Sequence, residues 1–266
     1  MKNWLLKGFL VVASALPVLG GMAFASPIPF TWDPSQATPA LSGAGSAFTA
    51  DTINATNYLH SVVQPNGSFA QELILKINSF QLNGQSVTAP GFNSGYGLYF
   101  AINATGQLGA PTTYSTLNIA LMADPGNADG SLSSSIAGVS FSNTGPSGVA
   151  DDFILGAGTL IAASMSFNPI TMVRSAHYVE SFAPAPNETD FFDGISPVLE
   201  VFLTTFPAVF QALPQPDGSS ILLVNGGIAG VNFVPEPSPI VLLASGLLGL
   251  CLVRRRRVHR QLSSLP

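Results

Sequence analysis

An all-β fold is the prediction from this sequence, more specifically a single domain of the β-sandwich or jelly-roll type. Short apolar runs alternate with clusters of Gly, Ser, Asn and Pro, and few stretches have helical periodicity. In residues 68–80, Phe69, Leu73, Leu75 and Ile77 share one parity while polar residues lie between them, as in a half-buried strand. Eighteen phenylalanines supply a large apolar area for a two-sheet core.

The first two expected strands, residues 58–63 and 68–80, form a hairpin, because Asn66-Gly67 between them is typical of a tight turn. Six further apolar runs bounded by turn residues are expected to be strands. They are residues 97–104, 116–123, 159–167, 171–182, 198–204 and 220–224.

Turn residues separate several of these runs. Asn168-Pro169 divides two of them, and Asn225-Gly226-Gly227 ends the last one. Residues 207–213 fit either a strand or a helical turn. The Gly-, Ser- and Asn-rich stretch 125–146 is expected to be a long loop, with a boundary between two subdomains as the alternative.

Charge is distributed unevenly along the chain. All fourteen acidic residues lie between Asp33 and Glu236, and Lys76 and Arg174 are the only basic residues in that stretch. Two positive against fourteen negative side chains give it a net charge of −12, which the whole-chain value of −5 conceals. Nucleic acids and anionic membrane surfaces both require clustered Lys and Arg, so neither is an expected partner.

Residues 1–25 are typical of a secretory signal peptide. Lys2 and Lys7 precede an apolar stretch, and Ala23 and Ala25 frame a small-x-small cleavage box. We expect the secretion translocon to export the chain and signal peptidase to cut after Ala25. An uncleaved membrane anchor is the alternative, which the short apolar stretch and the cleavage box disfavour.

The chain ends in a motif, an apolar run and a basic cluster, within residues 235–266. Pro235, Glu236 and Pro237 form a stiff, extended motif, because each proline fixes its own φ and restricts the preceding residue. The apolar run 239–253 predicts one short transmembrane helix, below the usual span of about 20 residues. The basic cluster holds the C-terminus on the cytoplasmic side. It consists of Arg254, Arg255, Arg256 and Arg257.

Residues 26–234 are the expected central domain. The single cysteine, Cys251, lies outside it, so the domain folds without disulfides and depends on its hydrophobic core. Cys251 itself is interpreted as a small apolar filler of the C-terminal helix, with lipidation as the alternative.

In order and position, the three C-terminal features resemble the PEP-CTERM sorting signal of Gram-negative bacteria that make extracellular polysaccharide. In that family the membrane protease-transpeptidase exosortase recognises the Pro-Glu-Pro motif and removes the tail. The resemblance therefore implies exosortase as a partner and a precursor anchored in the inner membrane. It implies a product at the cell surface or in the extracellular matrix.

A second resemblance covers most of the chain. Five segments look like flocculation-associated PEP-CTERM proteins, which are linked to floc formation with exopolysaccharide. The segments are residues 30–33, 48–51, 90–100, 151–155 and 158–161. That group has no established catalytic residues, so the resemblance implies extracellular polysaccharide as a partner and no reaction.

Histidine is scarce, which limits the catalytic arrangements that the sequence can supply. A Ser-His-Asp hydrolase would use His177 as its base, but the Gly-x-Ser-x-Gly elbow is absent. Packed or solvated strand residues are the favoured interpretation of His60 and His177. A glycosidase needs two carboxylates at a defined separation, which no spacing here provides. The aromatic residues that could stack on a sugar are scattered along the chain: Trp32, Tyr96, Tyr99, Tyr114 and Tyr178.

One acidic turn is a weak candidate for metal binding. Asp124, Asn127 and Asp129 place hard oxygen donors on a flexible turn, as calcium requires. Pro125 breaks the EF-hand register, so a plain Asx-rich turn is the favoured interpretation. The acidic residues at 151–152 and 188–193 present the same choice. No other cofactor is expected.

The sequence thus predicts an exported, non-catalytic protein of the cell surface or extracellular matrix. It would be sorted by exosortase and associated with exopolysaccharide and with flocculation or biofilm formation. The alternative is an exported hydrolase acting on matrix polysaccharide. His177 beside a serine and a carboxylate in one cleft would favour the hydrolase, and acidic residues scattered over loop tips would favour the binding protein.

Overall fold

The computed structural model describes most of the central domain and confirms that it is all-β. The described residues are 26–109, 112–126, 140–142, 145–147, 151–167, 174–193, 195–206 and 210–235. The expected signal peptide and the tail beyond Pro235 lie outside them. Within the described part of the chain, no helix has the length and hydropathy needed to span a bilayer.

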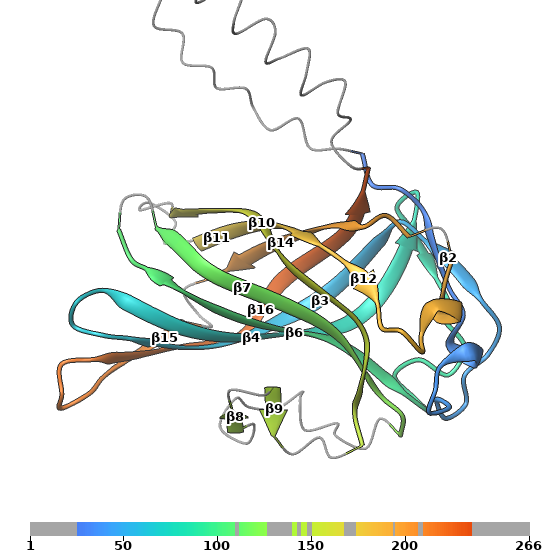
Figure 1. Ribbon diagram of the computed structural model, residues 1–266, viewed down its shortest axis with the longest axis horizontal. Coiled ribbons are helices and arrows are strands. Elements are labelled where there is room, and N and C mark those ends of the chain that lie inside the picture. The colour runs from blue at the N-terminus through green and yellow to red at the C-terminus, as the bar shows by residue number, and fades with distance from the viewer. Residues whose placement is uncertain are drawn as a thin grey trace, which may run out of the picture.

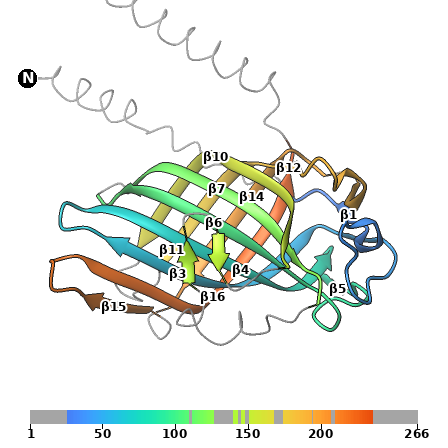
Figure 2. The ribbon, with the colours of Figure 1, turned by 60° about the horizontal axis from the view of Figure 1, so that its bottom comes forward.

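Eight long antiparallel strands form a closed barrel (Figures 1 and 2). In chain order they are β3 (Thr52–Val63), β4 (Ser68–Leu82), β6 (Gly97–Gln107), β7 (Thr113–Asp124), β10 (Phe153–Phe167), β11 (Arg174–Ser181), β14 (Val198–Thr205) and β16 (Ser220–Val234). Each strand pairs with the next one in this order, and β16 pairs with β3. The sheet therefore closes on itself, whereas the sandwich expected from the sequence would consist of two stacked sheets.

Smaller elements decorate the barrel. A three-stranded sheet of β1 (Phe30–Trp32), β2 (Phe48–Ala50) and β13 (Phe192–Asp193) covers one end. Short strands extend the barrel sheet and a separate hairpin lies outside it. These are β5 (Gln85–Val87), β12 (Ala183–Pro184) and β15 (Phe210–Pro214) on the sheet, and the hairpin of β8 (Ser140–Ser142) and β9 (Gly145–Ser147). The described residues also contain two single 3-10 turns, Pro34–Gln36 and Thr189–Phe191.

Side chains alternate between the barrel interior and its outer surface, as the period of a strand requires. On β4 the expected parity is confirmed, because Phe69, Leu73, Leu75 and Ile77 are all buried. The same alternation on the other long strands fills much of the interior with Leu, Ile, Val, Ala and Phe. All eight segments expected to be strands are barrel strands, although their bounds differ by several residues.

The largest difference concerns the end of the last strand. The glycine pair after Val224 was expected to end it, but β16 continues to Val234. Its register shifts between Asn225 and Gly227, which is a β-bulge, and Gly226 has a positive φ of 98°. Glycine accommodates such a bulge without ending the strand, because it lacks the Cβ that disfavours positive φ. Residues 207–213 were expected to form either a strand or a helical turn. Strand β15 (Phe210–Pro214) covers the described part of this segment.

Aromatic side chains close the barrel end that β1, β2 and β13 cover, and we call them the aromatic plug. Trp32 is fully buried, with its ring 5.4 Å from Phe80 and 5.6 Å from Phe191. The plug consists of Phe30, Trp32, Phe48, Phe80, Phe182, Phe191, Phe192 and Phe233. Several of the segments that carry the second resemblance therefore supply core packing.

Both described chain ends lie at the plugged end of the barrel (Figure 1). The amide of Ile28 donates to the carbonyl of Phe233 at 2.9 Å. The Ser196 hydroxyl also donates to the carbonyl of Val234. Pro235, the first residue of the expected sorting motif, follows directly and is exposed.

Candidate functional site

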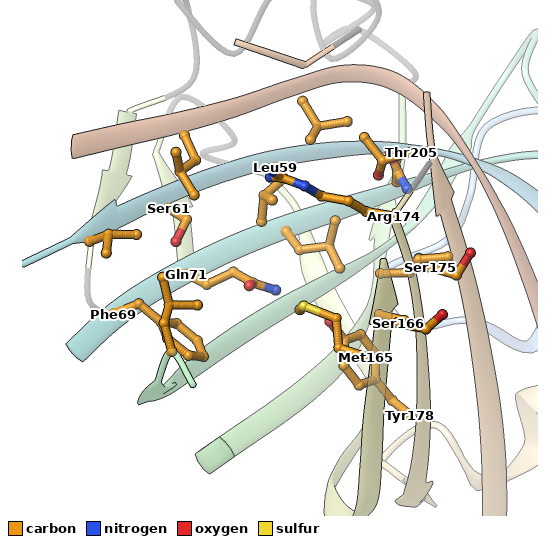
Figure 3. A pocket seen from close by; sticks show the side chains of 18 of the residues that line it. Leu59, Ser61, Phe69, Gln71, Met165, Ser166, Arg174, Ser175, Tyr178 and Thr205 are labelled. Carbon is orange, nitrogen blue, oxygen red and sulfur yellow. The ribbon is translucent and has the colours of Figure 1, made fainter. Parts of the chain in front are cut away.

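The opposite end of the barrel contains a cavity of about 450 Å³, which is the candidate functional site (Figure 3). Its lining is mostly apolar, with a few amide, hydroxyl and phenol groups and one cation. The strands β3, β4, β10, β11, β14 and β16 supply most of the lining. Because β16 runs from Ser220 at the cavity to Phe233 in the plug, one strand connects the hollow end to the packed end.

Strand register orders the inward side chains into levels. Leu59 of β3 lies opposite Leu73 of β4 and opposite Val224 of β16. One step further toward the opening, Ser61 lies between Gln71 and Leu222. The inward face of these strands is therefore mainly apolar, with Ser61 and Gln71 as polar residues within it.

Asn57 is a buried polar residue of the cavity wall. Its side chain is 1% exposed, and its Oδ1 has no hydrogen-bond partner among the described residues. A Cβ on Gly227, in the bulge of β16, would lie 2.1 Å from this oxygen. Because Gly227 has no side chain, the Asn57 amide has room at this position. The Oδ1 atom of Asn57 can therefore accept a hydrogen bond from a ligand in the cavity.

A short chain of hydrogen bonds crosses the barrel beside the cavity. The hydroxyl groups of Tyr114 and Tyr178 lie 3.0 Å apart, and the Gln71 side chain also hydrogen-bonds Tyr178. Burial raises the pKa of both phenols, and their mutual contact adds to the shift of Tyr114. Both groups therefore stay neutral and fix the shape of this wall.

Among the described residues that line the cavity, Arg174 is the one charged residue. It begins β11 and shares its parity with Ala176 and Tyr178, so it points inward. Figure 3 shows its side chain extended over the cavity toward Leu59 of β3. Burial lowers the pKa of the guanidinium, which still remains protonated because arginine does not lose its proton in proteins.

Glu180 lies further inside the barrel on the same face of β11. It is fully buried, and neither carboxylate oxygen has a hydrogen-bond partner among the described residues. Burial raises the pKa of this carboxyl from its ordinary value of 4.5 to about 8. Near neutral pH most Glu180 side chains are thus protonated and uncharged.

The residues considered for hydrolysis lie on the outer face of the barrel, away from the cavity. The Nε2 atom of His177 is 3.8 Å from Oε1 of Glu200, and its ring stacks on Phe202 at 4.5 Å. Ser164 is the cross-strand neighbour of His177. Burial lowers the pKa of His177 and raises that of Glu200, so both shifts favour neutral side chains. His60 also faces outward, opposite Glu72.

The weak calcium site is only partly described. Asp124 is buried, and its Oδ1 accepts a hydrogen bond from the Gly126 amide at 3.2 Å, as in an Asx turn. Asn127 and Asp129 lie outside the described residues. Of the other acidic residues considered, Asp152 accepts from the Tyr99 hydroxyl, and Glu188 accepts from the Thr38 amide. In the part of the chain that is described, no three acidic, His or Cys side chains gather into a metal site.

The sorting residues can be placed only in part. Glu236, Pro237, Arg254–Arg257, Ala23 and Ala25 lie outside the described residues, whereas Pro235 is the last described residue. The aromatic residues considered for sugar stacking are mostly buried. Trp32, Tyr96, Tyr99 and Tyr178 are at most 1% exposed, which leaves their faces unavailable to a polymer.

Of the residues that line the cavity, only Tyr178 was a sequence-based site candidate, as one of the aromatic residues that could stack on a sugar. Arg174 was noted only as one of two cations between Asp33 and Glu236. Its parity with Ala176 and Tyr178 was a usable signal, because a cation on the apolar face of a strand points into the interior. No local sequence pattern indicated the cavity itself, because residues from six strands line it.

The fold and cavity define an up-and-down antiparallel barrel that is packed at one end and hollow at the other. No family model, curated protein or solved structure matches this chain. The role of the protein is therefore inferred from the geometry of the cavity and from the motifs near the two ends of the sequence.

Proposed function

We propose that this chain is an exported, non-catalytic binding protein that holds a small, largely apolar molecule in the open end of its barrel. The observation that carries the proposal is the cavity of about 450 Å³ between inward-facing Leu, Val, Met and Phe side chains. Eight-stranded barrels are either filled by side chains or hold one small ligand. The cavity volume falls within the range of about 300–1,000 Å³ that is typical of small-molecule sites.

The few polar groups support binding over reaction. Asn57, Gln71 and Tyr178 can orient a ligand by hydrogen bonds, and such sparse polar groups in an apolar pocket are typical of recognition sites. No carboxylate and no histidine belongs to the described residues that line the cavity. The described lining thus offers neither the paired acids of a glycosidase nor the base of a serine hydrolase.

We place the protein at the cell surface or in the extracellular matrix, with exosortase as its processing enzyme. The support is the order of the signal peptide, the Pro235-Glu236-Pro237 motif, the apolar run and the arginine cluster. In this scheme the inner membrane holds the precursor, and exosortase acts on the segment directly after β16. Association with exopolysaccharide and with flocculation is part of the proposal, through the Asn-, Ser- and Thr-rich outer surface.

Replacing Pro235, Glu236 and Pro237 together by alanine should leave the protein at full length and bound to the membrane. The reason is that the processing enzyme then lacks its recognition motif, while the apolar run and Arg254–Arg257 still hold the tail. Fractionation followed by immunoblotting measures the result. The matched control replaces Pro214, Gln215 and Pro216, an exposed Pro-x-Pro turn in the barrel, which should not alter release. Normal processing of the first variant would refute the sorting proposal.

Ligand binding is tested with N-phenylnaphthylamine, a neutral apolar dye whose fluorescence rises when it leaves water. We expect the secreted barrel to bind it and Ala176→Phe to lower the affinity by about tenfold or more, a free-energy change of about 1.4 kcal/mol. Ala176 lines the cavity, whereas Ala70→Phe makes the same change on the exposed face of β4. Equal dye binding by the two variants would place the dye outside the cavity.

A hydrolase acting on polysaccharide is the second candidate. The observation that favours it is the neighbourhood of Ser164, His177 and Glu200 on the outer face. Against it, the His177 ring is stacked on Phe202, and the cavity lies on the other side of the sheet. Hydrolysis of matrix polysaccharide by the purified wild-type barrel, lost in His177→Ala, would replace the binding proposal.

A further inference from the structure

We propose that the ligand is an elongated apolar acid, whose carboxylate pairs with Arg174 at the rim while its hydrocarbon chain fills the cavity. This inference rests on the cavity being a ligand site, as proposed above. It goes further because it assigns a chemical class and an orientation to the molecule that binds. Three features of the described residues carry it: the placement of charge, the position of Arg174 and the lining beneath it.

The placement of charge is the first feature. Between Asp33 and Glu236 the chain has fourteen acidic residues and two basic ones. None of the acidic residues that the structure describes lines the cavity, yet one of the two cations does. The described lining supplies a guanidinium and no carboxylate, so a cationic ligand would lose its hydration without gaining an opposite charge, whereas an anion would gain one.

The position of Arg174 is the second feature. It is the first residue of β11 and lies opposite Thr205, the last residue of β14, so it stands at the open end. Its side chain extends across the cavity toward Leu59 (Figure 3), so the aliphatic stem covers apolar surface and the guanidinium lies over the cavity. A guanidinium binds a carboxylate through two parallel hydrogen bonds, which fixes the orientation of the acid group.

The apolar lining is the third feature. Beneath the rim, facing side chains from four strands form a continuous apolar wall. They are Leu59, Leu73, Leu203, Leu222 and Val224. A hydrocarbon chain that enters this space loses its contact with water, and each buried methylene contributes about 0.8 kcal/mol. An acid with its carboxylate at the mouth can therefore pair with Arg174 at the rim while its hydrocarbon chain packs against the apolar wall.

The net charge of the barrel does not prevent this binding. At physiological ionic strength, charges that are exposed and more than about 8 Å apart are largely screened. The contact with Arg174 acts at hydrogen-bond distance in a partly desolvated site, where screening is weak. Repulsion by the acidic surface should therefore slow association more than it weakens the complex.

The test measures displacement of N-phenylnaphthylamine by dodecanoate and by dodecanol, below their micelle concentrations. These two competitors share the chain and differ in the charged group. For the wild-type protein we expect dodecanoate to bind about tenfold to a hundredfold more tightly than dodecanol, as a charge-assisted hydrogen-bonded pair predicts. In Arg174→Gln this ratio should fall to about one, and Arg174→Lys should restore part of it.

Lys76→Gln is the matched control, because it removes the other cation of the barrel from the outer side of β4 and leaves the cavity intact. Its acid-to-alcohol ratio should equal that of the wild type.

The outcomes separate the two proposals. Failure of the wild type to bind the dye refutes the ligand site itself. Dye binding with equal affinities for acid and alcohol, or a ratio unchanged in Arg174→Gln, refutes the acid while leaving the site.

Discussion

Replacing Glu180 by methionine should remove a large loss of stability that the wild-type barrel suffers as the pH rises. The pKa of Glu180 is raised by burial from 4.5 to about 8. Between these two values the folded state binds a proton that the unfolded state has lost, so the free energy of unfolding falls with rising pH. The full shift corresponds to on the order of 5 kcal/mol, a large share of the typical stability of a domain.

Thermal unfolding followed by circular dichroism, at pH 5 and at pH 9, measures this effect. The Tm of Glu180→Met minus the Tm of the wild type should be larger at pH 9 than at pH 5. For a domain of this size, the increase should be roughly 10–20 °C. The control Asp190→Asn removes an exposed negative charge outside the interior, and its difference from the wild type should stay nearly constant. If Glu180→Met follows the wild-type pH profile, Glu180 does not titrate inside the barrel.

Truncating Trp32 to alanine should destabilise the barrel by about 3–5 kcal/mol, the usual cost of deleting a large buried aromatic side chain. Trp32 is fully buried at the centre of the aromatic plug, where its ring contacts Phe30, Phe48, Phe80 and the Phe191–Phe192 pair. Edge-to-face pairs such as Trp32–Phe192 stabilise the fold beyond what the burial of apolar surface contributes. The cavity left by alanine lies between rigid strands, which limits collapse.

Urea unfolding at neutral pH measures the change. Trp32→Phe is the informative comparison, because it keeps a ring and removes an indole N–H that has no partner among the described residues. We expect Trp32→Phe to lose much less stability than Trp32→Ala. The plug and the cavity are at opposite ends of the barrel, so folded Trp32→Phe should bind the dye as the wild type does. Equal losses for the two variants would show that the ring packing at this position contributes little.

The strand prediction succeeded where a single strand carries its own evidence. The alternation of Phe69, Leu73, Leu75 and Ile77 with polar residues located β4, and its buried parity is that of the barrel interior. It failed at Asn225-Gly226-Gly227, where turn chemistry and bulge chemistry use the same residues. Whether a glycine pair ends a strand or bends it depends on the neighbour, here Asn57 of β3.

The candidate site was not predictable in the same way. Arg174 was visible as a rare cation, but its place at the rim follows from pairing with β10 and β14. Glu180 was one of many acidic residues, and its burial depends on Leu160 and Leu199 of the neighbouring strands. Such contacts join segments far apart in the chain, and no local pattern reports them.

The linear order of residues was enough to establish an all-β chain, the positions of eight strands and the excess of negative charge between Asp33 and Glu236. These properties are local or additive, so they can be counted along the chain. Closure of the sheet was decided in three dimensions, when β16 paired with β3. A period of two specifies which side chains share a face, whereas twist and register specify whether the two edges of a sheet meet. The packed end, the hollow end and the inward cation all follow from that closure.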